Sequence, residues 1–96
     1  MRTINMNVLQ VNTYNTKDIY YININQIVNF KYEEISNHKY IHIITTTMHI
    51  NRALVVTDVV EAGKIIKETL RQIEYAQKSP IIDINDIQIR LRKEKE

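Results

Sequence analysis

Cysteine is absent from this 96-residue sequence, and glycine and proline occur once each. Without cysteine the chain cannot form a disulfide, a thiolate nucleophile or a cysteine-ligated zinc or iron–sulfur site. A single glycine leaves no glycine-rich loop to hold a phosphate and no strained turn to present a catalytic serine. Acidic neighbours such as Glu33 and Glu34, or Asp83 and Asp86, are typical of solvated surface. We therefore expect no enzyme activity and no cofactor.

Long apolar runs and a strong charge imbalance are also missing. Apolar runs cover only a few residues, far short of the ~20 that a membrane-spanning helix needs, and the N-terminus lacks the apolar segment of a signal peptide. The 13 basic and 11 acidic residues give a net charge of +2, too little to indicate nucleic-acid binding by charge alone. We expect a cytoplasmic protein without a membrane partner. The excess of isoleucine and asparagine, which A+T-rich codons encode, adds a phage particle or an infected cell as a second location.

Short segments of alternating polar and apolar residues dominate the first half of the sequence. Such alternation is typical of strands with one buried face. A change of phase predicts a bulge at Val8–Leu9, and polar composition predicts loops at residues 33–39 and 44–47. The pattern predicts five strands, at residues 3–14, 20–24, 27–32, 41–43 and 48–50.

A helical period follows the strands. Asp58 is the expected N-cap, and Glu61 lies three residues later, as in a capping box. The helix should cover about residues 59–78 and end at Ser79–Pro80. Gly63 within its apolar stripe predicts a close approach of the helix to the sheet. The stripe that should face the core contains Val59, Ala62, Gly63, Ile66, Leu70, Ile73 and Ala76 or Gln77.

Residues 81–91 return to alternation and predict a C-terminal strand. The expected fold class is therefore α+β, with an antiparallel sheet of about five strands, one long amphipathic helix and then this strand. Residues 1–79 form the sheet-plus-helix domain. Residues 80–96, the strand and a charged tail, either belong to that domain or act as an arm that pairs with a partner.

The three histidines are the candidates for a metal site. A register with Ile43 opposite Met48 would make His42 and His49 cross-strand neighbours, with His38 nearby. Imidazoles in this arrangement could bind zinc or nickel. Since no carboxylate or cysteine is spaced to complete a tetrahedral set, we expect surface polar residues here and no metal.

Two binding modes remain for a non-catalytic domain of this kind. The first is a structural or interaction module that forms a homo-oligomer or docks onto a protein assembly, because an extra edge strand is a template for pairing with another chain. Its expected partner-binding residues are Ile82, Ile84, Ile87, Ile89, Arg90, Leu91 and Arg92.

The alternative is a single-stranded nucleic-acid-binding protein or small regulator. Aromatic side chains on a sheet face can stack on bases, and nearby cations can bind phosphates. The residues that would serve this mode are Tyr20, Tyr21, Tyr32, Tyr40, Lys31, Lys39 and Arg52.

Three segments resemble the small FlbD/SwrD-like bacterial proteins: residues 22–28, 43–46 and 59–61. The resemblance covers roughly residues 8–70. It implies a short antiparallel sheet followed by a helix, an association with flagellar motor function and no catalytic site. Only this strand–strand–helix layout carries over, and no functional residue does.

Overall fold

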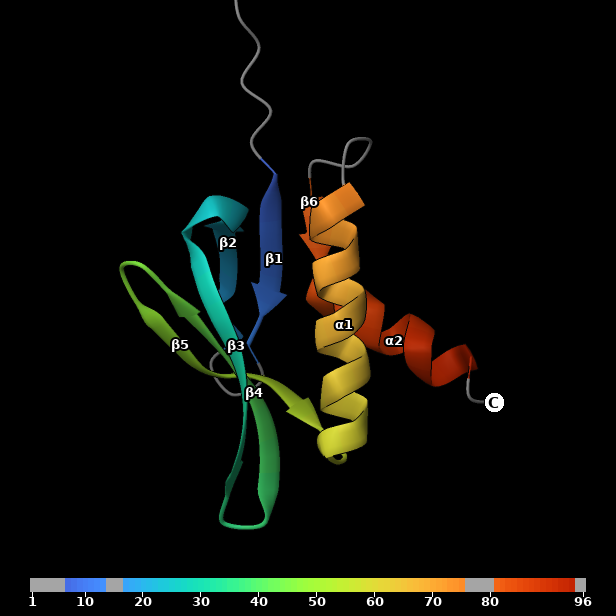
Figure 1. The fold of residues 1–96 in the computed structure, drawn as a ribbon. Coiled ribbons are helices and arrows are strands. Elements are labelled where there is room, and N and C mark those ends of the chain that lie inside the picture. Colours follow the sequence, from blue (N-terminus) through green and yellow to red (C-terminus); the bar gives the residue numbers. More distant parts are fainter. Residues whose placement is uncertain (1–6, 14–16, 76–80, 95–96) are drawn as a thin grey trace, which may run out of the picture.

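The computed structural model describes residues 7–13, 17–75 and 81–94, and the elements below lie in those ranges (Figure 1). Neither of the two described α-helices is both long enough and apolar enough to cross a membrane. In chain order the elements are β1 (Val8–Asn12), β2 (Ile19–Asn23), the 3-10 helix η1 (Ile24–Gln26), β3 (Ile27–Ile35), β4 (His38–Thr45), β5 (His49–Val56), α1 (Val59–Tyr75), β6 (Ile81–Asp83) and α2 (Ile84–Glu94).

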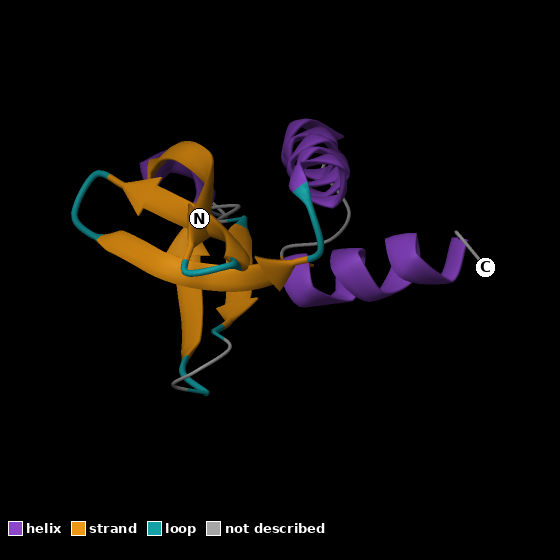
Figure 2. Cartoon of the chain, turned by 90° about the horizontal axis from the view of Figure 1, so that it is seen from below, coloured by secondary structure: helices purple, strands orange, loops and turns teal. Residues whose placement is uncertain are grey.

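The described strands form two three-stranded sheets, ordered β2-β1-β6 and β3-β4-β5. The α+β class is confirmed, but the single sheet of about five strands is wrong, and so is the single helix. β6 runs parallel to β1. A parallel pair needs a long crossover connection, and the chain between these two strands includes α1. Figure 2 shows the strands gathered together and α2 extending away from them.

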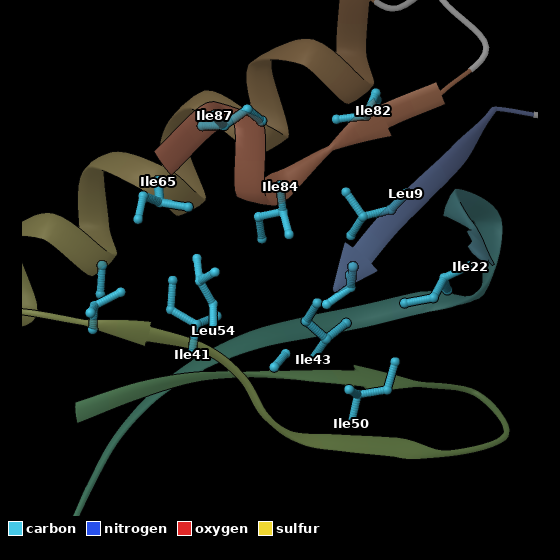
Figure 3. Close-up of a cluster of buried hydrophobic side chains, with 14 residues drawn as sticks. Leu9, Ile22, Ile41, Ile43, Ile50, Leu54, Ile65, Ile82, Ile84 and Ile87 are labelled. Carbon is cyan, nitrogen blue, oxygen red and sulfur yellow. The ribbon is translucent and has the colours of Figure 1, made fainter. Parts of the chain in front are cut away.

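One core joins both sheets and both helices. Figure 3 shows Leu9 of β1, Ile41 of β4 and Ile65 of α1 converging with Ile84 and Ile87 of α2, and all five are at most 1% exposed. Ile84 and Ile87, which follow Pro80 in the sequence, therefore pack in the same buried cluster as the first strand and α1. The buried cluster contains Leu9, Val11, Ile22, Ile41, Ile43, Ile50, Ala53, Leu54, Val56, Ala62, Ile65, Ile82, Ile84 and Ile87.

The first hairpin pairs β1 with β2 in an uninterrupted register, from Val8 opposite Asn23 to Asn12 opposite Ile19. The predicted bulge at Val8–Leu9 is wrong. The alternation that suggested it began at Ile4, and residues 1–6, like 14–16, lie outside the described residues.

The polar loop predicted at residues 33–39 is also wrong. β3 and β4 continue through this segment and meet at a two-residue turn, where Ser36 and Asn37 have φ values of 50° and 68°. Two positive φ values are typical of the type I′ turn, whose twist matches that of paired strands. Composition suggested a loop here because paired residues such as Glu34 and Lys39 are charged.

The β4–β5 pair has a different register from the predicted one. Ile43 pairs with Ile50, not with Met48, and a bulge on β5 follows, since the next partners are Ile41 and Leu54. Arg52 lies in this bulge with φ of 55°. Alternation does not reveal the bulge, because β5 advances four residues from Ile50 to Leu54 while β4 advances two from Ile43 to Ile41, and two extra residues leave the period-two phase unchanged.

The tip of this hairpin is tighter than the predicted loop at residues 44–47. The backbone N–H of Thr45 donates to Met48 O at 2.8 Å. The Thr45 hydroxyl also donates to Met48 O at 2.8 Å and accepts from Met48 N at 2.9 Å. The side chain thus closes a turn that the backbone of two threonines alone would not favour.

The start of α1 is as predicted at its N-cap. Asp58 Oδ1 accepts from the backbone N–H of Glu61 at 2.8 Å. The Glu61 carboxylate reaches back one residue further than in a capping box, to the backbone N–H of Thr57 at 2.9 Å. The described helix runs to Tyr75, and the predicted end at residues 76–80 lies outside the described residues.

The face that α1 buries differs from the predicted stripe. Its buried residues are Glu61, Ala62, Ile65 and Thr69, whereas Val59 and Leu70, expected in the core, are 58% and 50% exposed. Polar residues can take core positions here because both find partners. The Thr69 hydroxyl donates to Ile65 O at 2.7 Å, and Glu61 binds Arg92.

The predicted C-terminal strand ends at Asp83, where α2 begins. Asp83 Oδ1 accepts from the backbone N–H groups of Asn85 and Asp86, at 3.0 and 3.2 Å, and so caps the helix. The Asn85 side chain exchanges two hydrogen bonds with the backbone of Asn12, at 2.9 and 3.1 Å. This amide continues the pairing beyond β6 and anchors the start of α2 to the end of β1.

Candidate functional site

An apolar groove lies between the edge strand β3 and one side of α1. It measures about 250 Å³ and is open to solvent. Val28 at its rim is 64% exposed and Leu70 across from it is 50% exposed. A groove with large apolar side chains on both walls is a typical protein-binding surface. Its lining residues are Ile27, Val28, Asn29, Phe30, Ile66 and Leu70.

The fold creates this groove through two features. Among the described strands, β3 has β4 as its one hydrogen-bonded neighbour, so its other edge borders the groove. α1 is rotated so that Ile65 and Thr69 point into the core, which leaves Leu70 on the outside and Ile66 at the boundary. The rotation that buries Thr69, whose hydroxyl donates to Ile65 O, therefore leaves Leu70 exposed.

A continuous apolar line runs along this side of α1. Its members alternate in spacing by four and three residues, and we call this line the α1 seam. Ile66 and Ile73 are partly buried against the core, and the other members are exposed. The seam consists of Val59, Gly63, Ile66, Leu70 and Ile73.

Gly63 does not make the close approach to the sheet that the sequence suggested. A Cβ atom built on Gly63 would meet no atom of the described residues within 4 Å apart from its chain neighbours and the adjoining backbone of α1. Glycine inside a helix costs about 1 kcal/mol relative to alanine. Contacts within the described chain do not explain why this position lacks a side chain.

Gly63→Ala is expected to raise the free energy of unfolding of the monomer by up to about 1 kcal/mol, because alanine restricts the unfolded chain and favours helix. Urea denaturation at a low, fixed protein concentration measures the change. A decrease in stability would show that the position is crowded in the folded monomer, contrary to the open space around it.

Glu61 and Arg92 connect the two helices. Arg92 Nε donates to Glu61 Oε2 at 2.7 Å and Arg92 Nη2 donates to Glu61 Oε1 at 3.0 Å. Hydrogen bonds from Arg92, followed by those from Thr57, outweigh the effect of burial and lower the pKa of Glu61 from 4.5 to about 2. The ionised carboxylate of Glu61 therefore links α1 to α2 through its hydrogen bonds with Arg92.

The C-terminal residues predicted to bind a partner are divided between core and surface. Ile82, Ile84 and Ile87 are 2%, 0% and 1% exposed within the chain's own core, and Leu91 packs partly against it. Ile89, by contrast, is 52% exposed. Of the two arginines, Arg92 binds Glu61, and Arg90 pairs with Asp86 at 3.2 Å.

His42, one of the metal candidates, is buried on the face of the second sheet that lies opposite Ile41 and Ile43. One of its ring nitrogens, Nδ1, lies 3.1 Å from Asn51 Oδ1. Its Nε2 lies 3.0 Å from Glu33 Oε2, although that oxygen is not aligned for a hydrogen bond. The arrangement is a polar network within the sheet.

The three histidines do not converge. His49 pairs with Ile44, not with His42, and the His38 ring lies beside Tyr40. Across residues 7–13, 17–75 and 81–94, no three histidine or acidic side chains come together as a metal-binding group. The register of the β4–β5 hairpin, which sets His49 opposite Ile44 and Ile50 opposite Ile43, separates the predicted pair of histidines.

The aromatic residues assigned to the nucleic-acid alternative are spread over both sheets. Tyr20 and Tyr21 lie on β2, whereas Tyr32 and Tyr40 lie on β3 and β4. Tyr40 is only 6% exposed, and it lies on the opposite face from Tyr32, which pairs with Ile41. These rings do not form one stacking platform.

The cations of that alternative are spread in the same way. Arg52 lies over the Tyr40 ring, 5.6 Å from its centre. Lys31 and Lys39 are opposite His42 and Glu34 respectively. Partial burial, followed by a hydrogen bond to Glu34, raises the pKa of Tyr32 to about 12.

Sequence reasoning missed the groove because it assigned its walls to the core. Its strand wall lies within the strand predicted at residues 27–32, and Leu70 belongs to the helix stripe predicted to face the core. A signal was present, since Ile65 lies outside the predicted stripe and widens the apolar arc of α1. An apolar arc of that width indicates a helix with a second apolar contact.

Comparisons with protein-family models, with curated proteins and with solved structures found no match for the chain. The resemblance to FlbD/SwrD-like proteins stays a prediction.

Proposed function

We propose that this protein is a non-catalytic interaction module that self-associates or docks onto a larger protein assembly through the groove between β3 and α1. The observation that carries the proposal is the exposure of Val28 and Leu70 on facing walls of one apolar groove. Covering such side chains with another protein removes apolar surface from water, at about 25 cal/mol per Å².

The groove replaces the C-terminal segment as the main contact surface. Ile82, Ile84 and Ile87 already serve the chain's own core, so among the isoleucines expected to bind a partner Ile89 is the one that is largely exposed. The nucleic-acid alternative has less support from the geometry, because its tyrosines lie on different sheets and faces.

Leu70→Glu is expected to abolish self-association or partner capture, because it places a charge in the apolar groove. Ile89→Glu is the matched control, since Ile89 is 52% exposed on a helix and Leu70 is 50% exposed. Multi-angle light scattering across a concentration series, together with capture of partners from a cell extract, measures the effect. Circular dichroism confirms that both variants fold.

The two variants separate the groove from α2 as the contact surface. Loss of association in Leu70→Glu alone supports the groove. Loss in Ile89→Glu alone would move the contact to α2. The proposal would be contradicted if the wild-type chain is a monomer and either captures no partner or captures the same partners as Leu70→Glu. Salt-sensitive binding of a labelled oligonucleotide, unchanged by Leu70→Glu, would favour the nucleic-acid alternative.

A further inference from the structure

The spacing of the α1 seam is that of a helix which packs against another helix. Steps of four and three residues alternate from Val59 through Gly63, Ile66 and Leu70 to Ile73, as in the apolar positions of paired helices. At 1.5 Å per residue the seam is about 21 Å long. The chain's own elements cover only part of it, since Val59 and Leu70 are 58% and 50% exposed.

Gly63 shows what kind of surface fits the seam. The open space above it lets a large side chain of an approaching helix come close to the backbone. In an antiparallel pair of α1 helices centred between Ile66 and Leu70, Gly63 of one copy lies opposite Ile73 of the other. Ile66 likewise lies opposite Leu70. The seam is therefore complementary to itself, with its small residue facing a large one.

The charges beside the seam favour the antiparallel over the parallel orientation. Lys67 and Glu74 are exposed on its solvent side. A parallel pair would set lysine beside lysine and glutamate beside glutamate. An antiparallel pair retains one lysine pair at its centre, but it moves each Glu74 toward the Lys67 of the other copy and opposes the two helix dipoles.

We infer that the α1 seam binds the α1 seam of a second copy of this chain in antiparallel orientation, with the groove beside β3 receiving apolar side chains of that copy. This inference rests on the proposed function and names its partner. It predicts a two-fold axis near Lys67, since residues close to the centre of an antiparallel pair meet their own copies.

Single-cysteine variants test this geometry cleanly, because the natural chain contains no cysteine. Lys67→Cys is expected to form a disulfide between two copies under mild oxidation with oxidised glutathione. Lys64→Cys, the matched control, lies on the same helix but away from the seam and should stay largely uncrosslinked. Non-reducing gels of the full-length protein measure the difference.

Gly63→Leu gives an independent second measurement. It replaces a helix-destabilising glycine at an exposed position where an added Cβ meets open space, so the chain should fold. Filling the space meant for Ile73 of the second copy should raise the dimer dissociation constant by about tenfold or more. Sedimentation equilibrium gives the constant, and circular dichroism reports the fold.

The outcomes for this inference and for the proposed function can be told apart. If Leu70→Glu disrupts self-association but Lys67→Cys crosslinks no better than Lys64→Cys, antiparallel pairing is overturned and the groove remains a binding surface. If the wild-type chain is monomeric but captures another protein through Leu70, antiparallel pairing is likewise overturned and the groove remains a binding surface. If it is monomeric and captures nothing, both are overturned.

Discussion

Ile87→Ala is expected to lower the free energy of unfolding by about 2–5 kcal/mol, the usual cost of truncating a fully buried isoleucine. Ile87 is 1% exposed in the core, whereas Ile89, two positions along, is 52% exposed. Ile89→Ala should therefore change stability by less than about 0.5 kcal/mol. The contrast arises because α2 turns these two side chains to different sides.

Chemical denaturation of the two variants measures this contrast directly. In a strand, Ile87 and Ile89 would point to the same face, and both substitutions would cost a similar amount. Comparable losses would therefore contradict the helix at Ile84–Glu94. Ile84→Ala, at a 0% exposed position, is expected to match Ile87→Ala.

Glu61→Gln is expected to lower the free energy of unfolding by about 2 kcal/mol at neutral pH, because it removes the charge from a hydrogen-bonded, largely buried ion pair. The Glu61 side chain is 10% exposed, and it holds Arg92 and the backbone N–H of Thr57 together. Arg92 is 49% exposed and can turn to solvent in the variant. Because Arg92 can be solvated in this way, the decrease in the free energy of unfolding should be smaller than when a buried charge is left without a partner.

The pH dependence of this effect follows from the lowered pKa of Glu61. Its folded value of about 2 lies below the usual 4.5, so the unfolded chain binds a proton first as the pH falls. The stabilisation is complete above about pH 4.5 and is lost as the pH falls toward 2. The shift bounds the contribution at about 3 kcal/mol.

Denaturation curves of wild type and Glu61→Gln at several pH values test the sign. The stability difference should be largest near neutral pH and shrink toward pH 2. Glu68, whose pKa is also lowered to about 2 by its hydrogen bonds with Arg71, titrates in the same window, so Glu68→Gln is the control. Because Arg71 is 59% exposed, solvent screening should make that effect smaller. A difference for Glu61→Gln that does not depend on pH would contradict the role of its charge.

The local features of this fold could be predicted from the sequence where neighbouring residues determine them. Alternation located strands β2, β3 and β4, and the spacing of Asp58 and Glu61 located the start of α1. The residues after Asp83 show the limit. Ile87, Ile89 and Leu91 fit a period of two, whereas Ile84, Ile87 and Leu91 fit a helical spacing of three and four residues. The cap formed by Asp83 favours the helix.

The candidate site depended on the rotation of α1, and local patterns did not predict that. Two overlapping apolar lines exist in this helix, one through Ala62 and Ile65 and one through Val59 and Leu70. The second line is more apolar, yet the first faces the core, because Thr69 and Glu61 find hydrogen-bond partners there. Those partners are Ile65 O and Arg92, and Arg92 lies 31 positions away in the sequence.

By itself the sequence determined the α+β class, most of the strands and the N-cap of α1, because these follow from periodicity and from contacts over a few residues. Its lack of cysteine and of glycine-rich loops likewise directed the functional hypothesis toward binding. Only the tertiary structure decided how the strands divide into two sheets, that α2 is a helix, and which side of α1 remains uncovered. These outcomes depend on contacts between distant residues, such as Asn12 with Asn85 and Glu61 with Arg92, and on polar groups being satisfied when they are buried.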